Sequence, residues 1–345
     1  MLNRPAEPLE VAGLQAQPGE RVEGYLPVGE LPDGSPVRVP IVLVRGLRPG
    51  PVVYLQAVSD GDELNGIAVL HRLLRALSPK DLAGGLILVP LVNPSAFLAR
   101  QAYNPLDRKK MNRCFPGRPD GSASERIAYT LFHEAVLRAD LCIDLHQGGV
   151  RPMIDEVRVR VGGDHPLYRD CMELARVFGI GYILDERGPD GQLARAAPDA
   201  GIPTIDPELG GCYGWDAQSI AKGLRGVQNV LFHYGLIEGT PQIPDVQYVA
   251  RGFRSVYTRR AGFVEWAVEL YDRVAAEQRL GVLYNIFGDP IEELRAPCEG
   301  IVWSRSLYPM VAAGEVAMSL GVNVEVWKGD QSPAPSWRSH PLPRR

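Results

Sequence analysis

The sequence predicts an α/β fold, with a mostly parallel or mixed sheet flanked by helices and a smaller C-terminal β domain. Between residues 42 and 234, short apolar segments alternate with amphipathic helical segments. This alternation is typical of strands joined by crossover helices. From residue 262 to residue 321 the segments become short and β-rich, with turn sequences between them. A chain of 345 residues is also long enough for about two domains of roughly 150 residues.

Each element of the α/β part follows from its local pattern. Runs of apolar and β-branched residues predict strands, whereas apolar residues at helical spacing predict helices. Ser122 and Glu125 have the spacing of a capping box, which predicts that a helix begins there. In chain order we expect strands at 42–44 and 52–58, a helix at 63–77, a strand at 86–92, a long loop at 93–121, a helix at 122–139, strands at 141–145 and 157–161, a helix at 167–178, a strand at 203–207 and a helix at 216–234.

Composition divides the chain into four expected parts. Residues 1–40 are rich in Gly, Pro and Glu and predict a β-rich N-terminal arm. Residues 41–245 form the α/β domain, and residues 250–325 form the small β domain. Residues 328–345 are rich in Pro, Ser and Arg, which predicts a disordered tail. The arm and the β domain are both candidates for contacts in a homo-oligomer.

Charge and hydropathy exclude several classes of protein. The 37 basic and 41 acidic side chains give a net charge of -4, which argues against a nucleic-acid-binding protein. No apolar run approaches the roughly 20 residues that span a bilayer, and the N-terminus lacks an apolar signal core. The five cysteines are scattered, as in reduced cytoplasmic proteins. We therefore expect a cytoplasmic protein that binds neither membrane nor nucleic acid.

Polar side chains gather where the predicted strands end. In an open α/β sheet, ligands bind at the carboxyl ends of the strands. Four of these ends present a carboxylate, an imidazole or a guanidinium group, in most cases beside glycines. The candidate site residues are Asp60, Glu63, Asn112, Arg113, His146 and Glu208.

Asp60, Glu63 and His146 are candidate metal ligands. Two carboxylates at positions i and i+3 can face one point, and an imidazole from a neighbouring strand can complete three ligands. Catalytic zinc sites typically use three protein ligands and keep one position for water. The alternative is that Asp60 and Glu63 only favour the N-terminus of the helix that follows them.

Glu208 and the pair Asn112-Arg113 are candidates for proton transfer and substrate binding. A carboxylate at the end of an apolar strand is partly desolvated, which suits general acid–base work. The alternative for Glu208 is a structural ion pair with a nearby arginine. Arg113 offers a planar fork for a substrate carboxylate, although a solvated arginine is the commoner case. The sequence contains no Gly-x-Ser-x-Gly elbow and no Walker A loop.

Four sequence blocks carry a resemblance to a known family. The blocks are DGDELNG at 60–66, MNRCFPG at 111–117, DLHQGG at 144–149 and ELGG at 208–211. With these blocks the chain resembles the succinylglutamate desuccinylase/aspartoacylase family of the zinc carboxypeptidase-like superfamily, over roughly residues 42–321.

The resemblance implies a metal-dependent hydrolase that cleaves an amide bond of a small, carboxylate-bearing substrate, such as an N-acyl amino acid. Residues 41–245 would be its carboxypeptidase-like metal hydrolase domain. By position, Glu208 matches the general base, and Asn112 and Arg113 match the pair that holds a substrate carboxylate. The arginine that stabilises the oxyanion in this family has no clear equivalent, because Ala102 aligns there.

The implied metal site departs from the family pattern. Glu63 and His146 match metal ligands, but Asp60 stands where the family has His, and Lys110 stands where it has Asp. Two carboxylates and one imidazole form a more oxygen-rich set than two imidazoles and one carboxylate, and such sets suit harder ions. We therefore expect one divalent ion, zinc, with manganese or iron as alternatives.

Two other functions stay open at this point. One is a carboxypeptidase that acts on short or modified peptides. The other is a catalytically silent homologue that still binds a small carboxylate-bearing molecule, because Asp60 replaces the usual histidine ligand.

Overall fold

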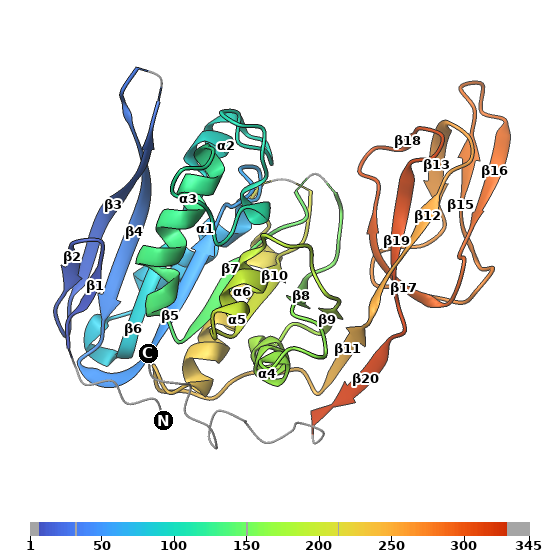
Figure 1. The fold of residues 1–345 in the computed structure, drawn as a ribbon. Coiled ribbons are helices and arrows are strands. Elements are labelled where there is room, and N and C mark those ends of the chain that lie inside the picture. The colour runs from blue at the N-terminus through green and yellow to red at the C-terminus, as the bar shows by residue number, and fades with distance from the viewer. Residues whose placement is uncertain (1–6, 32, 150, 213, 330–345) are drawn as a thin grey trace.

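The computed structural model describes residues 7–31, 33–149, 151–212 and 214–329. Its centre is a ten-stranded mixed sheet with the order β20-β11-β9-β8-β10-β7-β5-β6-β4-β3 (Figure 1). The predicted mixed α/β sheet is therefore confirmed. Its strands are β3 (Arg21–Glu30), β4 (Pro36–Arg45), β5 (Arg48–Ala57), β6 (Ala83–Val89), β7 (Leu141–Leu145), β8 (Glu156–Val159), β9 (Tyr182–Asp185), β10 (Thr204–Glu208), β11 (Val246–Ala250) and β20 (Glu325–Lys328).

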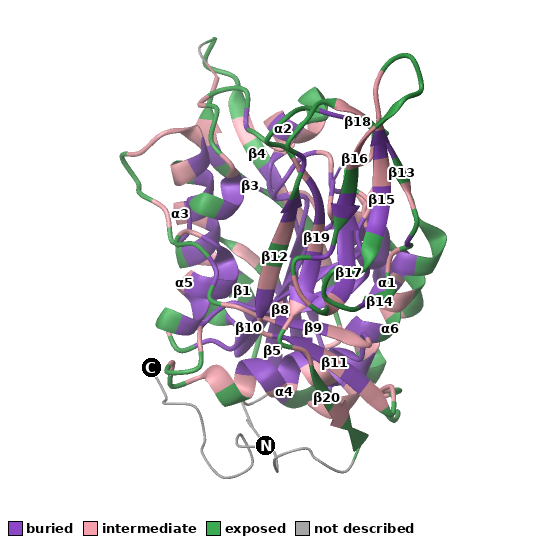
Figure 2. Ribbon diagram, turned by 90° about the vertical axis from the view of Figure 1, so that its right-hand side faces the viewer, coloured by how far each residue is buried: buried purple, intermediate pink, exposed green. Residues whose placement is uncertain are grey.

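The middle of the sheet is parallel. β5 pairs in parallel with both β6 and β7, and β10 pairs in parallel with β7. These strands are almost wholly buried (Figure 2), because helices cover both faces of a parallel sheet. Their carboxyl ends therefore meet at one edge.

Helices cover the sheet in two layers. α1 (Asn65–Ala76), α4 (Tyr168–Phe178) and α6 (Ala217–His233) pack on one face and share one core with the strands. α3 (Ala123–Glu134) and α5 (Leu193–Asp199) pack on the opposite face and belong to a second core. No helix in the described ranges combines the length and apolar character of a membrane span.

The helix starts agree with the sequence, with small shifts. The capping box at the start of α3 is present, and the Glu125 carboxylate accepts a hydrogen bond from the backbone N–H of Ser122 at 2.8 Å. The predicted long loop at 93–121 contains a short helix, α2 (Pro94–Ala99), and a 3-10 turn at Met111–Arg113. A second 3-10 turn, Val136–Arg138, follows α3, so the helix itself ends earlier than expected.

The N-terminal residues form strands, and β3 and β4 extend the central sheet. β1 (Leu9–Val11) and β2 (Leu14–Ala16) form a small antiparallel sheet, and their apolar residues join the second core. β3 pairs with β4, and β4 pairs with β6, both antiparallel. Of the tail predicted at 328–345, Lys328 ends β20, and the residues from 330 onward lie outside the described ranges.

The C-terminal β domain is also confirmed. It consists of two four-stranded sheets with their own apolar core. It leaves the central sheet after β11 and returns to it at β20, which pairs with β11. Its strands are β12 (Gly252–Tyr257), β13 (Gly262–Trp266), β14 (Arg273–Val274), β15 (Arg279–Tyr284), β16 (Pro290–Arg295), β17 (Gly300–Arg305), β18 (Met310–Val311) and β19 (Val316–Val322).

Candidate active site

His146 and Glu208 lie side by side at the carboxyl edge of the parallel strands. They follow β7 and end β10, and the two residues form a parallel β-bridge. The His146 N–H donates to the carbonyl of Pro207 at 2.8 Å, and the Leu209 N–H donates to the carbonyl of His146 at 2.9 Å. Two of the predicted site residues, 62 positions apart in the chain, are thus fixed by backbone hydrogen bonds.

The loop between β5 and α1 brings Asp60 and Glu63 to the same edge. Val58 has a φ of 60°, which is a strained conformation for a β-branched residue. Such strain is often found at functional sites. Gly61 allows close approach, because a Cβ there would lie 2.1 Å from the backbone carbon of Ala96. The chain therefore turns sharply after β5 and presents both carboxylates before α1 begins.

Asp60 and Glu63 do not cap α1. The side-chain oxygen of Gln147 accepts hydrogen bonds from the backbone N–H groups of Leu64 and Asn65, both at 3.0 Å. Glu63 instead contacts the residues that follow β7, since its Oε2 accepts from the Gln147 N–H at 3.1 Å. Gln147 therefore caps α1 in place of either carboxylate, and the electrostatic alternative for Asp60 and Glu63 stays a prediction.

Glu63 and His146 form a buried pair. Glu63 Oε2 lies 2.8 Å from His146 Nδ1. Burial and the nearby Asp60 raise the pKa of Glu63 to about 8. Burial alone would lower the pKa of His146, but Asp144 and Asp206 outweigh it and raise the pKa well above its usual value. Both shifts favour the protonated forms of the pair.

Buried polar groups that hydrogen-bond in series orient the His146 ring from its Nε2 side. Its Nε2 lies 3.1 Å from Asp144 Oδ2. Asp144 Oδ1 accepts from the Gln56 amide at 2.8 Å, and the Gln56 carbonyl oxygen accepts from the Tyr54 hydroxyl at 2.8 Å. A carboxylate behind a histidine fixes the ring and its tautomer. His146 therefore directs Nδ1 toward Glu63.

Asp60 forms an ion pair with Lys110. Lys110 Nζ lies 2.9 Å from Asp60 Oδ2, whereas Asp60 Oδ1 is buried and has no hydrogen-bond partner among the described residues. Burial alone would lower the pKa of Lys110, but Asp60 and, more weakly, Glu63 raise it. The ammonium group therefore stays charged beside the acidic cluster.

Glu208 pairs with Arg158, as the structural alternative for this residue supposed. Arg158 Nη1 lies 2.7 Å from Glu208 Oε1, and Arg158 Nη2 lies 2.8 Å from Glu156 Oε1. Glu208 Oε2 remains buried without a hydrogen-bond partner in the described part of the chain. Since only one oxygen is engaged, the ion pair is compatible with proton transfer at the other.

The pair Asn112-Arg113 reaches this region through the loop that carries Lys110. Asn112 is buried, and its Oδ1 has no hydrogen-bond partner among the described residues. Arg113 is exposed, and its Nη1 donates to the carbonyl of Asn112 at 2.6 Å. The structure thus links Asp60, Glu63 and His146 more tightly than it links Arg113 to them, and the roles predicted for this pair stay predictions.

In this arrangement, no three His, Cys, Asp or Glu side chains of the described residues are placed to hold a metal ion. The candidate donors are engaged elsewhere, because Glu63 bonds to His146 and Asp60 bonds to Lys110. Among the predicted site residues, two buried carboxylate oxygens have no hydrogen-bond partner in the described part of the chain, Asp60 Oδ1 and Glu208 Oε2. Asp60, Glu63 and His146 have side-chain types that bind divalent ions, but their present contacts do not place all three to hold one, and the metal site remains a prediction.

Sequence reasoning missed three residues that support the site. Asp144 and Asp206 each lie two positions before a predicted site residue, so strand alternation places them on the same face as that residue. Carboxylates inside apolar strands are the signal that could have found them. Arg158 gives a similar signal, because it lies within the β-branched run of β8.

The C-terminal β domain contacts the segment that follows His146. The Ile154 N–H donates to the carbonyl of Trp303 at 3.0 Å, and the Arg305 N–H donates to the carbonyl of Pro152 at 3.0 Å. The Tyr271 hydroxyl accepts from the Asp155 N–H at 3.1 Å. The domain is thus docked beside the strand-end cluster.

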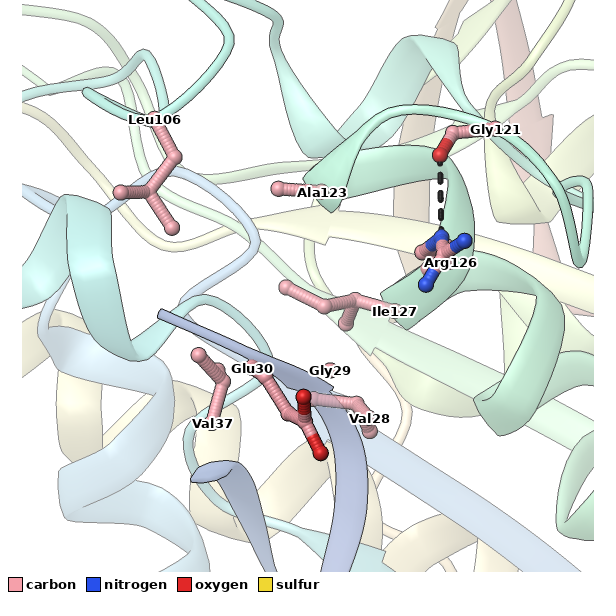
Figure 3. Close-up of a pocket in the computed structure, with 9 residues that line it drawn as sticks. All are labelled: Val28, Gly29, Glu30, Val37, Leu106, Gly121, Ala123, Arg126 and Ile127. Atoms are coloured by element: carbon pink, nitrogen blue, oxygen red, sulfur yellow. Dashed lines mark hydrogen bonds between the residues drawn. The ribbon is translucent and has the colours of Figure 1, made fainter. Parts of the chain in front are cut away.

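A separate cavity of about 250 Å³ lies between the β3–β4 hairpin and the start of α3 (Figure 3). It contains none of the predicted site residues, and Arg126 Nε donates to the carbonyl of Gly121 at its rim at 3.1 Å. This cavity is therefore distinct from the strand-end cluster. Its lining residues are Val28, Gly29, Glu30, Val37, Leu106, Gly121, Ala123, Arg126 and Ile127.

Comparisons with known proteins agree with the resemblance in the sequence. The model of the succinylglutamate desuccinylase/aspartoacylase catalytic domain matches residues 49–234. The N-alpha-acetyl-L-2,4-diaminobutyric acid deacetylase of Halomonas elongata is 32% identical over 298 residues, which are 84% of this chain and 87% of that protein.

Solved structures give the same result. The product-bound ectoine utilization protein EutE (DoeB) from Ruegeria pomeroyi has a TM-score of 0.82 at 28% identity, covering 93% of this chain and 100% of that chain. A succinylglutamate desuccinylase from Silicibacter sp. TM1040 has a TM-score of 0.81 at 28% identity, covering 94% and 100%. The chain therefore belongs to the succinylglutamate desuccinylase/aspartoacylase family.

Proposed function

We propose that this protein is a deacylase that hydrolyses the amide bond of a small N-acyl amino acid. An Nα-acetylated diamino acid is the first substrate to test, since the relative from Halomonas elongata is named for one. The observation that carries the proposal is the adjacency of Glu208 and His146 at the strand ends, with Glu208 Oε2 buried and without a hydrogen-bond partner among the described residues.

Glu208 is the proposed general base and acid. Its free Oε2 would take a proton from the attacking water and then deliver it to the leaving amine. Arg158 holds the other oxygen at 2.7 Å, which fixes the orientation of the carboxylate. Asn112 and Arg113 are proposed to bind the substrate carboxylate, because an amide and a guanidinium both donate to it.

A divalent metal ion is part of the proposal. Asp60, Glu63 and His146 would hold it, and Asp60 Oδ1 is the buried oxygen without a hydrogen-bond partner among the described residues. When bound, such an ion polarises a carbonyl and activates water. Zinc is the proposed ion, with manganese and iron(II) as alternatives for this oxygen-rich set. Asp144 supports the fit, since it stands behind His146 as a carboxylate does behind many metal-binding histidines.

A substrate panel tests the proposal. Purified protein is incubated with zinc, manganese or iron(II) and assayed for free amine from Nα-acetyl-L-2,4-diaminobutyrate, N-acetyl-L-aspartate, N-succinyl-L-glutamate and a dipeptide. We expect turnover of an N-acyl amino acid, and a loss of about 10²- to 10⁴-fold in kcat for Glu208→Gln. Arg259→Gln, in the C-terminal β domain, is the matched control for folding and handling.

The other outcomes identify the alternatives. Faster cleavage of the dipeptide than of every N-acyl amino acid would indicate a carboxypeptidase. Binding of these compounds without turnover under any metal would indicate a silent binding protein, the function that Asp60 in place of histidine favours. Unchanged turnover in Glu208→Gln would refute the role assigned to this residue.

A further inference from the structure

Lys110 presents its ammonium group to the acidic cluster at the strand ends. It lies in the loop before the 3-10 turn at Met111–Arg113, and it forms a β-bridge with Tyr103. Its Nζ lies 2.9 Å from Asp60 Oδ2 and 5.6 Å from the centre of the Tyr103 ring. The loop backbone and the aromatic face therefore hold the ammonium group in place.

The Asp60 carboxylate is buried, and Lys110 engages one of its two oxygens. Its carboxylate is 2% exposed, so water cannot compensate its charge. Oδ2 is engaged by Lys110, whereas Oδ1 has no hydrogen-bond partner among the described residues. A divalent ion at Asp60 would thus have to share this carboxylate with a charge of the same sign.

We propose that Lys110 is a resident cation that competes with the divalent metal ion for the Asp60 carboxylate. The inference rests on the proposed metal site, and it concerns affinity. The ammonium group neutralises Asp60 when no ion is bound, which stabilises the buried carboxylate. It also repels an incoming cation and withholds Oδ2. The native chain therefore binds metal more weakly than the same chain without this charge.

Metal affinity is the direct test. Metal-free wild-type protein, Lys110→Met and Lys110→Arg are titrated with zinc and with manganese against a chromophoric chelator, and metal content is measured after dialysis. We expect Lys110→Met to bind at least about tenfold more tightly. Removing a supporting group next to a metal ligand usually lowers affinity about 10- to 100-fold, and removing a competing charge should act with the opposite sign. Lys110→Arg keeps the charge and should bind like the wild type.

Lys109→Met is the matched control. Lys109 is the neighbouring lysine, but its Nζ pairs with Glu125 at 2.9 Å, away from Asp60. Its removal should leave metal affinity unchanged. If Lys110→Met does not fold in metal-free buffer, Lys110→Gln replaces it, because the amide keeps a polar head group without the charge.

Asp60→His separates competition for one carboxylate from general repulsion. A neutral imidazole offers no carboxylate to the ammonium group. In the Asp60→His background, Lys110→Met should therefore gain less than about threefold in affinity, so the two substitutions are coupled. Equal gains in both backgrounds would show repulsion without competition for Asp60 and would overturn the proposal.

Two further results would overturn it. One is equal or weaker metal binding by Lys110→Met, and the other is the same gain in Lys109→Met. These results are independent of the deacylase assay. A chain that shows the predicted affinities but hydrolyses no N-acyl amino acid would refute the proposed function alone, whereas an active chain with unaltered affinity in Lys110→Met would refute the role of Lys110 alone.

Discussion

Replacing Arg158 with methionine should destabilise the protein strongly at neutral pH. The guanidinium lies 2.7 Å from Glu208 and 2.8 Å from Glu156, and the Glu156 side chain is fully buried. N–O contacts of this length place the charge centres about 4 Å apart, where one pair is worth about 4 kcal/mol at an effective dielectric constant of about 20. Two such pairs are lost.

Part of this energy is recovered. The variant no longer desolvates a guanidinium, and a buried carboxylate without its partner can take up a proton. The net loss expected for breaking a buried ion pair is therefore about 3–5 kcal/mol. Methionine keeps the length of the apolar stem, so packing contributes little to the difference.

The pH dependence identifies the cause. Burial raises the pKa of Glu156, and Arg158 opposes this effect. Without the guanidinium the folded-state pKa rises further, so the folded variant binds more protons than the unfolded chain. The stability of the variant then falls as the pH rises from the unfolded-state pKa of Glu156 to its raised folded-state pKa. Arg158→Met should regain part of its deficit between pH 7.5 and pH 5.5.

Urea unfolding of both proteins at the two pH values measures this. The control is Arg118→Met, since Arg118 lies 3.5 Å from Asp120 and both side chains are exposed, at 63% and 81%; it should change stability little. A loss below about 1 kcal/mol for Arg158→Met, or a deficit independent of pH, would refute the reasoning.

Two other substitutions test α3 and α6, which pack on the sheet that carries the site. The hydrogen bond from the backbone N–H of Ser122 lowers the pKa of Glu125 to about 2. The stabilising effect of the Glu125 carboxylate is therefore present above pH 4.5 and is lost as the pH falls toward 2. Glu125→Gln keeps the geometry of the capping box but removes the charge, so it should cost about 0.3–1 kcal/mol at pH 7 in urea unfolding and much less at pH 2.5; an equal loss at both pH values would contradict the charge argument. Gly226→Ala in α6 would place a Cβ 2.3 Å from the ring of Phe178, and this overpacking should cost about 1–3 kcal/mol. A Tm equal to that of the wild type would show that the ring can move aside.

The sequence predicts the core of the site because strand ends are easy to locate. β5, β7 and β10 are apolar runs, and the polar residues that follow them must meet at one edge. His146 and Glu208 form a β-bridge for this reason. The family resemblance depends on the same positions, and the comparisons confirm the family.

The remaining contacts depend on residues that no local pattern joins. Lys110 and Asp60 are 50 positions apart, and Lys110 lies in a loop without periodicity. Arg158 reaches Glu208 only because β8 pairs antiparallel with β10, a pairing that an apolar run does not reveal. α5 contains Pro198, which obscures its helical pattern. The composition of residues 1–40 predicts a β-rich arm but not that β3 joins the central sheet.

Hydrolysis in oxygen-18-labelled water tests the central claim most directly. The protein is loaded with the metal that it retains and given Nα-acetyl-L-2,4-diaminobutyrate, and the released acetate is analysed by mass spectrometry. An amide hydrolase places one oxygen atom from water in each acetate, and Glu208→Gln should abolish most of this labelled product. Unlabelled acetate, or no acetate from any N-acyl amino acid under any metal, would contradict the assignment of this strand-end cluster as the active site of a deacylase.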